Sequence, residues 1–178
     1  MSRDRAQELE VAALVARAAP VDFEIGLDEL TRIAPLLARA GGRASGQFRF
    51  LRFADSGPDA AFDAAEGMVS ARLVLTCQRC LGEVDVEVAE HCALAFVEDD
   101  AAAAEVPATH DPVVMRQGRV ALDELVEEQL LLALPLVAMH SDASVCERQL
   151  AASSKGEEAG PEEPKQRPFA GLRDLMKK

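Results

Sequence analysis

The stretch EVDVEV, residues 83–88, decides the fold class of this chain. Its valines stand at even positions and its acids at odd positions, which is the two-residue period of a β-strand with one buried and one solvated face. The same parity continues through Cys92, Leu94 and Phe96. One long or bent strand is therefore expected to extend to Val97.

Two more strands are predicted ahead of this one. Residues 47–53, QFRFLRF, combine aromatic and other apolar side chains, and turn residues follow them at 55–58. A further strand is expected over 68–76. Together with residues 83–97, these strands predict an antiparallel meander.

Helix-like spacing occurs on the N-terminal side of the meander. Residues 7–18 and 27–40 both place apolar side chains at helical intervals, and Val21 to Ile25 alternate as a short strand between them. Pro35 lies inside the second predicted helix and weakens that prediction.

A second helical region follows the meander. Residues 98–112 read as an acidic loop whose alanine run can hold one helical turn. Residues 122–134 then carry an apolar stripe with acids in the first turn, and Pro135 stops the pattern. The predicted fold class is α+β, with an antiparallel meander of about three to five strands over residues 46–97 packed against this long helix.

The C-terminal part has a different composition. Residues 147–166 are polar, acidic and rich in Ala, Ser, Gly and Pro, so they are predicted to be a disordered linker after an α+β domain at 1–146. Residues 167–178 have the sequence RPFAGLRDLMKK. In a short helix this sequence would place Phe169 and Leu172 on one side. They are interpreted as a docking motif.

Composition limits the class of protein. The chain has 178 residues, 49% of them hydrophobic, and a net charge of −12. Its longest apolar run, 130–139, is interrupted by Pro135, whereas spanning a bilayer takes about 20 residues. No membrane segment and no signal peptide are recognised, so a cytoplasmic protein without a membrane partner is expected. Its four cysteines are then expected as thiols or metal ligands.

Cys77 and Cys80 form a CxxCxG motif between two predicted strands, which is the pattern of a zinc knuckle. This spacing lets both thiolates face one ion in a tight turn, and Gly82 permits a positive φ there. A reduced hairpin without metal is the alternative. A redox CxxC is a third reading, but thioredoxin-like chemistry uses a helix N-terminus, and here a strand follows.

A closed structural zinc site needs four ligands, and the knuckle supplies two. The candidates for the others are Cys92, Cys146, His91, His110 and His140. On a straight strand Cys92 would lie about 40 Å from Cys80, which favours a buried hydrophobic role for Cys92. His140 and Cys146 follow the long helix after a short turn and can return together. The predicted metal ligands are therefore Cys77, Cys80, His140 and Cys146, with structural zinc as the only expected cofactor.

No residue pattern nominates catalysis. The three histidines are scattered, and the sequence contains neither a GxSxG motif nor a glycine-rich phosphate loop. We expect no enzymatic activity and no small-molecule substrate.

Charge is distributed unevenly along the sequence. Residues 30–54 contain five arginines and no acid, whereas residues 55–111 contain thirteen acids and two arginines. Arginines interleaved with phenylalanines on a strand can contact phosphates or stack on unpaired bases. Alternatively, the phenylalanines are core and the arginines a solvated face. The predicted contacts with RNA or a partner protein are Arg43, Arg49, Arg52, Phe169, Leu172 and Arg173.

Three segments together resemble the YceD family, also called DUF177. They are TCQRCLGEVDVEV at 76–88, VEEQLLLALPLVAMH at 126–140 with Cys146 after it, and RPFAGLRDLMKK at 167–178. The family is associated with accumulation of large-subunit (23S) ribosomal RNA in bacteria and chloroplasts. The positions that match its motifs are Cys77, Cys80, Cys92, His140, Cys146, Pro168, Phe169 and Ala170.

The resemblance implies a non-catalytic role in ribosome biogenesis. The expected partner is a large-subunit ribosomal RNA precursor; the alternative is a basic large-subunit ribosomal protein bound by an acidic module or chaperone without RNA contact. The sequence departs from the family pattern at Ala121, Ala138 and Arg167. Ala121 removes a helix N-cap, which is worth about 1 kcal/mol.

Overall fold

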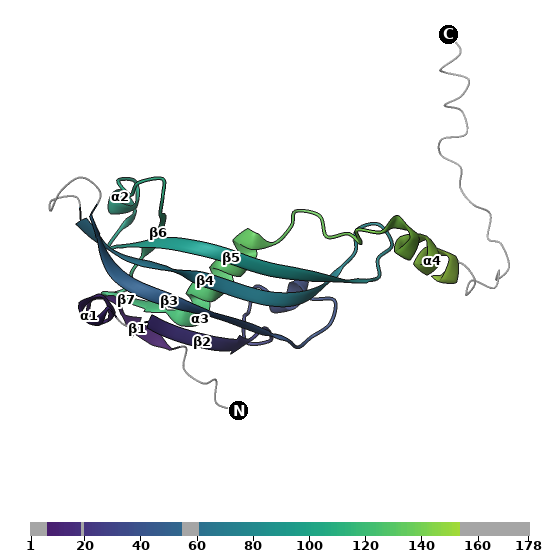
Figure 1. Cartoon of the computed structure of the whole chain (residues 1–178), viewed down its shortest axis with the longest axis horizontal. Coiled ribbons are helices and arrows are strands. Elements are labelled where there is room, and N and C mark those ends of the chain that lie inside the picture. Colours follow the sequence, from purple (N-terminus) through teal and green to yellow (C-terminus); the bar gives the residue numbers. More distant parts are fainter. Residues whose placement is uncertain (1–6, 19, 55–60, 154–178) are drawn as a thin grey trace, which may run out of the picture. The chain divides into compact units, whose positions relative to one another are not determined.

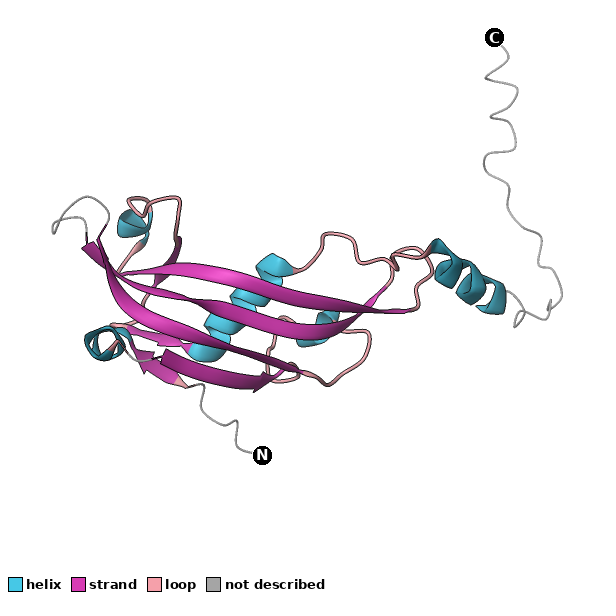
Figure 2. Cartoon of the chain, viewed as in Figure 1, coloured by secondary structure: helices cyan, strands magenta, loops and turns pink. Residues whose placement is uncertain are grey.

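A five-stranded sheet is the centre of the fold (Figures 1 and 2). The computed structural model describes residues 7–18, 20–54 and 61–153. The strands lie in the order β2 (Pro20–Gly26), β3 (Arg43–Ala54), β4 (Ala61–Thr76), β5 (Glu83–Val97) and β6 (Asp111–Val114). A separate two-stranded sheet pairs β1 (Glu8–Glu10) with β7 (Arg119–Ala121).

The helices are short. They are α1 (Val11–Arg17), the 3-10 helix η1 (Ala34–Leu36), α2 (Asp100–Ala103), α3 (Leu122–Ala133) and α4 (Ala143–Ser153). None of those in the described part of the chain has the length and apolar character needed to cross a membrane. The chain divides into two compact units, Met1–His140 and Ser141–Lys178, and α4 is the described part of the second.

The longest ladder of the sheet joins β4 to β5. Its antiparallel register runs from Asp63 opposite Phe96 to Thr76 opposite Glu83. In β5 the even-numbered Val84 and Val88 are buried, and the odd-numbered acids between them are exposed. The prediction from EVDVEV, one strand to Val97 with one buried face, is confirmed.

The predicted meander of β3, β4 and β5 is present, and β2 adds a fourth antiparallel strand. The predicted loop at 98–112 contains one helical turn, α2, as expected. The sequence prediction missed β6, which pairs with β5 in parallel, so the sheet is mixed. Asp111 and Pro112 were read as loop residues, but a four-residue strand at a sheet edge tolerates proline.

The hydrophobic core lies between this sheet and α3, which crosses one face of the strands (Figure 1). Phe48 and Phe50 of β3 are fully buried in it. Their rings stack on Phe23 and Phe96, with centroid distances of 5.2 and 5.5 Å. Because these rings are buried and stack on other rings of the sheet, the interpretation of the phenylalanines as core is confirmed for Phe48 and Phe50.

The predicted helix at 7–18 is shorter than expected. Residues Glu8–Glu10 form β1 and pair with β7, and α1 begins at Val11. Leu9 is buried opposite Val120. A single apolar side chain among the three residues of β1 fits a strand as well as a helix. The sequence pattern therefore could not show that α1 begins only at Val11.

The predicted helix at 27–40 is wrong. Only Ala34–Leu36 form one turn of 3-10 helix, with Pro35 in its first turn. Leu27, Leu30 and Ile33 are nevertheless fully buried. Their spacing reflects successive turns that direct apolar side chains to the core, and proline removes the N–H that a longer helix would use.

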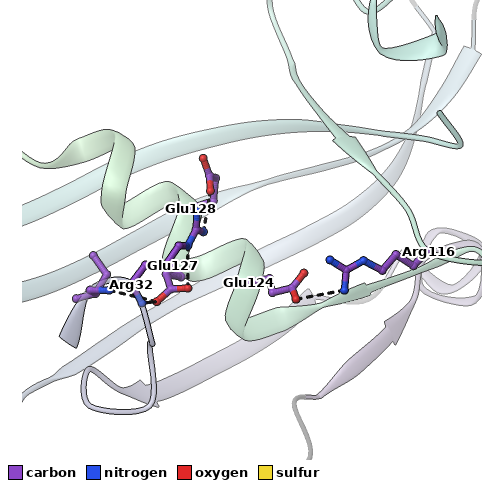
Figure 3. Close-up of polar contacts among 6 residues, drawn as sticks. Arg32, Arg116, Glu124, Glu127 and Glu128 are labelled. Carbon is purple, nitrogen blue, oxygen red and sulfur yellow. Dashed lines mark hydrogen bonds and ion pairs between the residues drawn. The ribbon is translucent and has the colours of Figure 1, made fainter. Parts of the chain in front are cut away.

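Glu127 of α3 stabilises this turn region (Figure 3). Its carboxylate accepts hydrogen bonds from the backbone N–H groups of Arg32 and Ile33, at 2.6 and 3.3 Å. It also pairs with the Arg32 guanidinium at 3.1 Å, while that guanidinium contacts Glu128 at 2.7 Å. One buried carboxylate thus replaces hydrogen bonds that a helix would have made internally.

The helix predicted at 122–134 is α3, which ends at Ala133 before Pro135. As expected from Ala121, no side chain caps its N-terminus. The backbone N–H of Leu122 instead donates to the carbonyl of Gln7 at 3.0 Å. The segment before β1 therefore substitutes for the missing cap.

The first residues of the predicted linker at 147–166 are helical in the structure. Helix α4 continues to Ser153, because Ala, Glu, Arg, Gln and Leu favour helix and Asp142 organises its start. The Asp142 carboxylate accepts bonds from the Ser144 hydroxyl and N–H, at 2.7 and 2.8 Å, and they lower the pKa of Asp142. The rest of the linker and the predicted docking motif lie outside the described residues.

Replacing Glu127 with Ala is expected to lower the free energy of unfolding by roughly 2–4 kcal/mol, because two backbone N–H groups lose a buried acceptor. Glu128→Ala is the matched control. Its carboxylate is half exposed and its loss should change stability by less than about 1 kcal/mol. Urea denaturation of both variants makes the comparison, and equal losses would contradict this role of Glu127.

Candidate metal centre

The two knuckle cysteines lie in the turn that joins β4 to β5. The Cys77 N–H donates to the Gly82 carbonyl at 2.8 Å, and the Leu81 N–H donates to the Cys77 carbonyl at 2.9 Å. Because Thr76 pairs with Glu83, the ladder ends immediately before the first cysteine. The CxxC turn predicted between two strands is therefore present and closed by backbone hydrogen bonds.

Leu81 carries the left-handed backbone of this turn, with a φ of 59°. The sequence predicted a positive φ at Gly82 instead, because glycine adopts positive φ without strain. A leucine in this conformation costs about 1 kcal/mol or more.

The chain that leaves α3 returns to the knuckle. The Gln78 N–H donates to the Ala138 carbonyl at 2.8 Å, which brings His140 beside Cys80. His140 Nδ1 lies 3.6 Å from Cys80 Sγ. Its Nε2 lies 2.9 Å from the Glu83 carbonyl oxygen.

This contact decides which nitrogen of His140 can bind a metal. A carbonyl oxygen only accepts hydrogen bonds, so Nε2 must carry the proton and donate to Glu83. The lone pair is then on Nδ1, the nitrogen that faces Cys80. Metal-binding histidines commonly use one nitrogen for the ion and the other for such a bond.

The ligand atoms of Cys77, Cys80 and His140 lie within 4.8 Å of one another. In a tetrahedral zinc site, with bonds of about 2.0–2.3 Å, neighbouring ligand atoms are roughly 3.3–3.8 Å apart. Two thiols and an imidazole at this spacing need only a small contraction to hold one ion. These three residues could bind a metal, as the sequence predicted.

Backbone donors make Cys77 suited to the thiolate form. Burial raises the pKa of its thiol, but hydrogen bonds from the backbone of Cys80, Arg79 and His140 outweigh burial and lower the pKa to about 5. Thiolates, not thiols, bind metals. The sequence alone does not reveal these donors, although the tight CxxC turn is the signal for two of them.

Cys92 has the opposite environment. It lies on β5 opposite Gly67, and its pKa rises to about 11 through burial and the nearby charges of Glu90 and Asp111. Its sulfur contacts the Glu90 carbonyl at 3.8 Å. Among the described residues, the group that could hold a metal includes neither Cys92 nor His91 or His110. The interpretation of Cys92 as a small buried hydrophobic residue is confirmed.

Cys146, the fourth predicted ligand, is buried and lies on α4 in the second unit. The four cysteines are all in the described residues, and no disulfide joins them.

The uneven charge along the sequence does not become separate charged regions in the described part of the fold. Most arginines of residues 30–54 form ion pairs: Arg32 with Glu127 and Glu128, Arg39 with Glu83, Arg43 with Glu24, and Arg52 with Asp63. Antiparallel pairing accounts for two of these, Arg43 with Glu24 across β2 and β3 and Arg52 with Asp63 across β3 and β4. Asp63 stands directly opposite Arg52, for example, although the two belong to sequence blocks of opposite charge.

The predicted contact residues have different positions. Arg43, Arg49 and Arg52 are exposed on β3. Within the described ranges, Arg49 forms no ion pair and stands opposite Glu66. Phe48 and Phe50 are buried and cannot stack on bases. Phe169, Leu172 and Arg173 lie outside the described residues. Contact of these residues with RNA or a partner stays a prediction.

Together, the fold and the site define an α+β protein whose central hairpin ends in a Cys/His knuckle. Residues 65–176 match the family model described as large ribosomal RNA subunit accumulation protein YceD, and the chain belongs to this family. The match includes most of β4, all of β5 and α3, and all of the candidate ligands. The family description links the protein to accumulation of the large ribosomal subunit's RNA. No solved structure matches the chain.

The pKa of Cys77 predicts how metal-free protein responds to acid. A thiol whose pKa falls from 9.0 to about 5 on folding contributes stability that is present above pH 9 and is lost as the pH falls towards 5. The free energy of unfolding, measured in chelator and reductant, should therefore decrease across this range. Cys77→Ser should remove that part of the decrease.

Cys92→Ser is the control for this measurement. Because its pKa is raised to about 11, Cys92 contributes stability below pH 9 that is lost as the pH rises towards 11. Its replacement should leave the acid-side slope unchanged. Identical slopes for Cys77→Ser and the unmodified chain would contradict the assignment.

Proposed function

We propose that this protein is a non-catalytic cytoplasmic factor that supports the synthesis, processing, stability or assembly of large-subunit ribosomal RNA. Membership of the YceD family carries the proposal, because the matched region spans the central hairpin, α3 and the knuckle. The factor acts by binding a ribosomal precursor. The knuckle keeps its binding surface rigid.

We further propose that Cys77, Cys80, His140 and Cys146 hold one structural zinc ion. Three thiolates and one imidazole form a complete tetrahedral set of the type found in closed structural sites. Cys146 is separated from His140 by five residues, so the chain lets it reach the same ion. Backbone donors to Cys77 and the Glu83 carbonyl on His140 support the ligands from outside.

A second candidate function is thiol oxidoreductase, favoured by the acidic pKa of Cys77. Two observations weigh against it. The Cys77 side chain is fully buried, so a substrate disulfide has no access to its sulfur. Cys77 also directly follows a strand instead of starting a helix. Cysteines that bind metals also have a low thiol pKa, so we attribute the low pKa of Cys77 to the zinc site.

The exposure and ion pairing of the β3 side chains bear on whether the partner is RNA or a protein. The arginine and phenylalanine pattern of β3 suggested RNA, but two phenylalanines are core and Arg43 and Arg52 are ion-paired. Their charge is therefore partly neutralised before any phosphate approaches. A net charge of −12 also opposes binding of RNA by a broad surface. These features support direct contact with a basic ribosomal protein and an indirect effect on the RNA.

The zinc proposal predicts about one zinc per chain after purification without added metal, measured by mass spectrometry of elements. Cys77→Ser and Cys146→Ser should each lose the ion and melt at lower temperature, because a structural zinc contributes about 10 kcal/mol or more of binding free energy. Cys92→Ser should retain the metal. A metal-free protein whose melting temperature is unchanged by chelator would refute the proposal.

Depletion of the protein from its own cells tests the function. Mature large-subunit RNA should fall relative to small-subunit RNA, and free large subunits should decrease in sucrose gradients. Complementation with the unmodified chain should restore both, whereas Cys77→Ser should restore them poorly. Unchanged RNA and subunit profiles after depletion would rule out the proposed role.

A further inference from the structure

A groove with a volume of about 570 Å³ lies between strand β6 and helix α3. This volume is within the range of roughly 300–1,000 Å³ that is usual for ligand pockets. Strand β6 contributes Pro112, Val113 and Val114 to its lining, and α3, β7 and residues 31–32 contribute most of the rest. We call it the β6–α3 groove. All of its lining residues belong to the first unit of the chain.

Four buried residues line the groove, and one of them has an unused polar group. Val120 and Leu125 are apolar, and Glu127 is already bonded to the backbone N–H groups of residues 32–33. Gln129 is only 5% exposed, and within the described ranges no hydrogen bond reaches its side-chain amide. A buried amide without a partner is unfavourable for folding, and leucine would fill the same place without this penalty. The amide therefore points to a ligand that can exchange hydrogen bonds with it.

Strand β6 also has backbone groups that no other strand uses. In the described part of the chain it is the last strand of the sheet, and it pairs only with β5. The Met115 N–H donates to the Val97 carbonyl, so the alternate residues Met115 and Val113 direct their backbone groups to β5. Val114 and Pro112 direct theirs outwards. Val114 thus offers an outward N–H and carbonyl, and Pro112 offers a carbonyl alone.

The groove follows this outer edge of β6. Consecutive residues of a strand place their side chains on opposite faces, so a groove that contacts Pro112, Val113 and Val114 must run along the strand's edge. The short length of β6 and its proline limit pairing with a long strand. One donor and two acceptors nevertheless remain, and they line the same groove as the unpartnered amide of Gln129. These groups match the backbone of an extended peptide, which binds a sheet edge by strand addition.

The charges around the groove argue against a nucleic acid. Its lining contains three arginines and four glutamates. Arg116 pairs with Glu124 at 3.5 Å and Arg32 pairs with Glu128 at 2.7 Å, so both signs occur along α3 (Figure 3). A lining without excess positive charge does not attract a phosphate backbone, whereas an uncharged peptide backbone needs no such excess.

We propose that the β6–α3 groove binds an extended peptide segment of another protein. The segment adds one antiparallel strand to β6: its residue opposite Val114 exchanges two backbone hydrogen bonds, and the Pro112 carbonyl accepts one more. An apolar side chain of the segment packs on Val120 and Leu125, and the Gln129 amide bonds to its backbone. Walls on both sides, β6 and α3, admit a single extended chain and exclude the edge of a second folded sheet. Peptide binding here does not require the proposed role in RNA accumulation.

Short random peptides displayed on phage and selected on the full chain provide the probe. The selected peptides are then synthesised, and their affinities are measured by calorimetry. Val114→Pro removes the outward N–H, which the pairing with β5 does not use, so the variant should melt close to the unmodified chain. Its affinity should fall roughly tenfold or more. Pro112→Val is the matched control. It adds an outward N–H and should bind equally well or more tightly.

Gln129→Leu tests the groove should Val114→Pro disturb the strand. Leucine keeps the volume and removes the amide, so the variant should melt at the same or a higher temperature while its affinity falls roughly fivefold to a hundredfold. Gln47→Leu makes the same exchange at an exposed glutamine of β3 outside the groove and should bind normally.

Hydrogen exchange gives a readout that a purely structural role of these residues would not move. Bound peptide should slow exchange of the Val114 N–H roughly tenfold or more, measured by nuclear magnetic resonance. Failure to select any peptide, equal binding by Val114→Pro and Gln129→Leu, or unchanged exchange at Val114 would each overturn the inference. Tighter binding in the groove by short single-stranded RNA, or by a synthetic peptide of residues 154–178, would also overturn it, because the occupant would then be a nucleic acid or the chain's own end.

Discussion

The antiparallel ladder between β4 and β5 is the constraint on which the rest of the structure depends. Its register, from Asp63 opposite Phe96 to Thr76 opposite Glu83, aligns the buried faces of both strands under α3. A shift of one residue would exchange the valines of β5 with its acids and remove the core. The same register sets the length of the turn, so Cys77 and Cys80 must lie at the end of the hairpin.

The knuckle shows how backbone groups prepare a site before any ion binds. Cys77 is fully buried, yet backbone donors favour its charged form, and the Glu83 carbonyl selects the nitrogen of His140 that faces Cys80. Cys92 on β5 accepts one such bond, from the backbone of Val69, but burial and the charges of Glu90 and Asp111 outweigh it and raise its pKa to about 11. Burial alone therefore does not decide what a cysteine does; the hydrogen bonds and charges around its sulfur decide it.

Ion pairs across strands change what the charge pattern means for function. Blocks of opposite charge that are distant in sequence become neighbours in the sheet, as Arg52 and Asp63 do. Among the arginines of residues 30–54, Arg49 is the exception, because within the described ranges it forms no ion pair.

The sequence by itself determined the α+β class, the alternation of β5, the stop of α3 before Pro135 and the CxxC turn, because each depends on neighbouring residues. The family assignment also followed from local motifs. It could not determine that residues 27–40 avoid a helix, since their hydrogen-bond acceptor, Glu127, is far away in the chain. Nor could it place β6, whose pairing is with β5. The short turn after α3 did predict that His140 can return to the knuckle, but only the structure shows which of its nitrogens faces Cys80. The pairing of the arginines and the exposure of Leu81 likewise required the tertiary structure, because contacts between distant segments are fixed only when the sheet and α3 pack together.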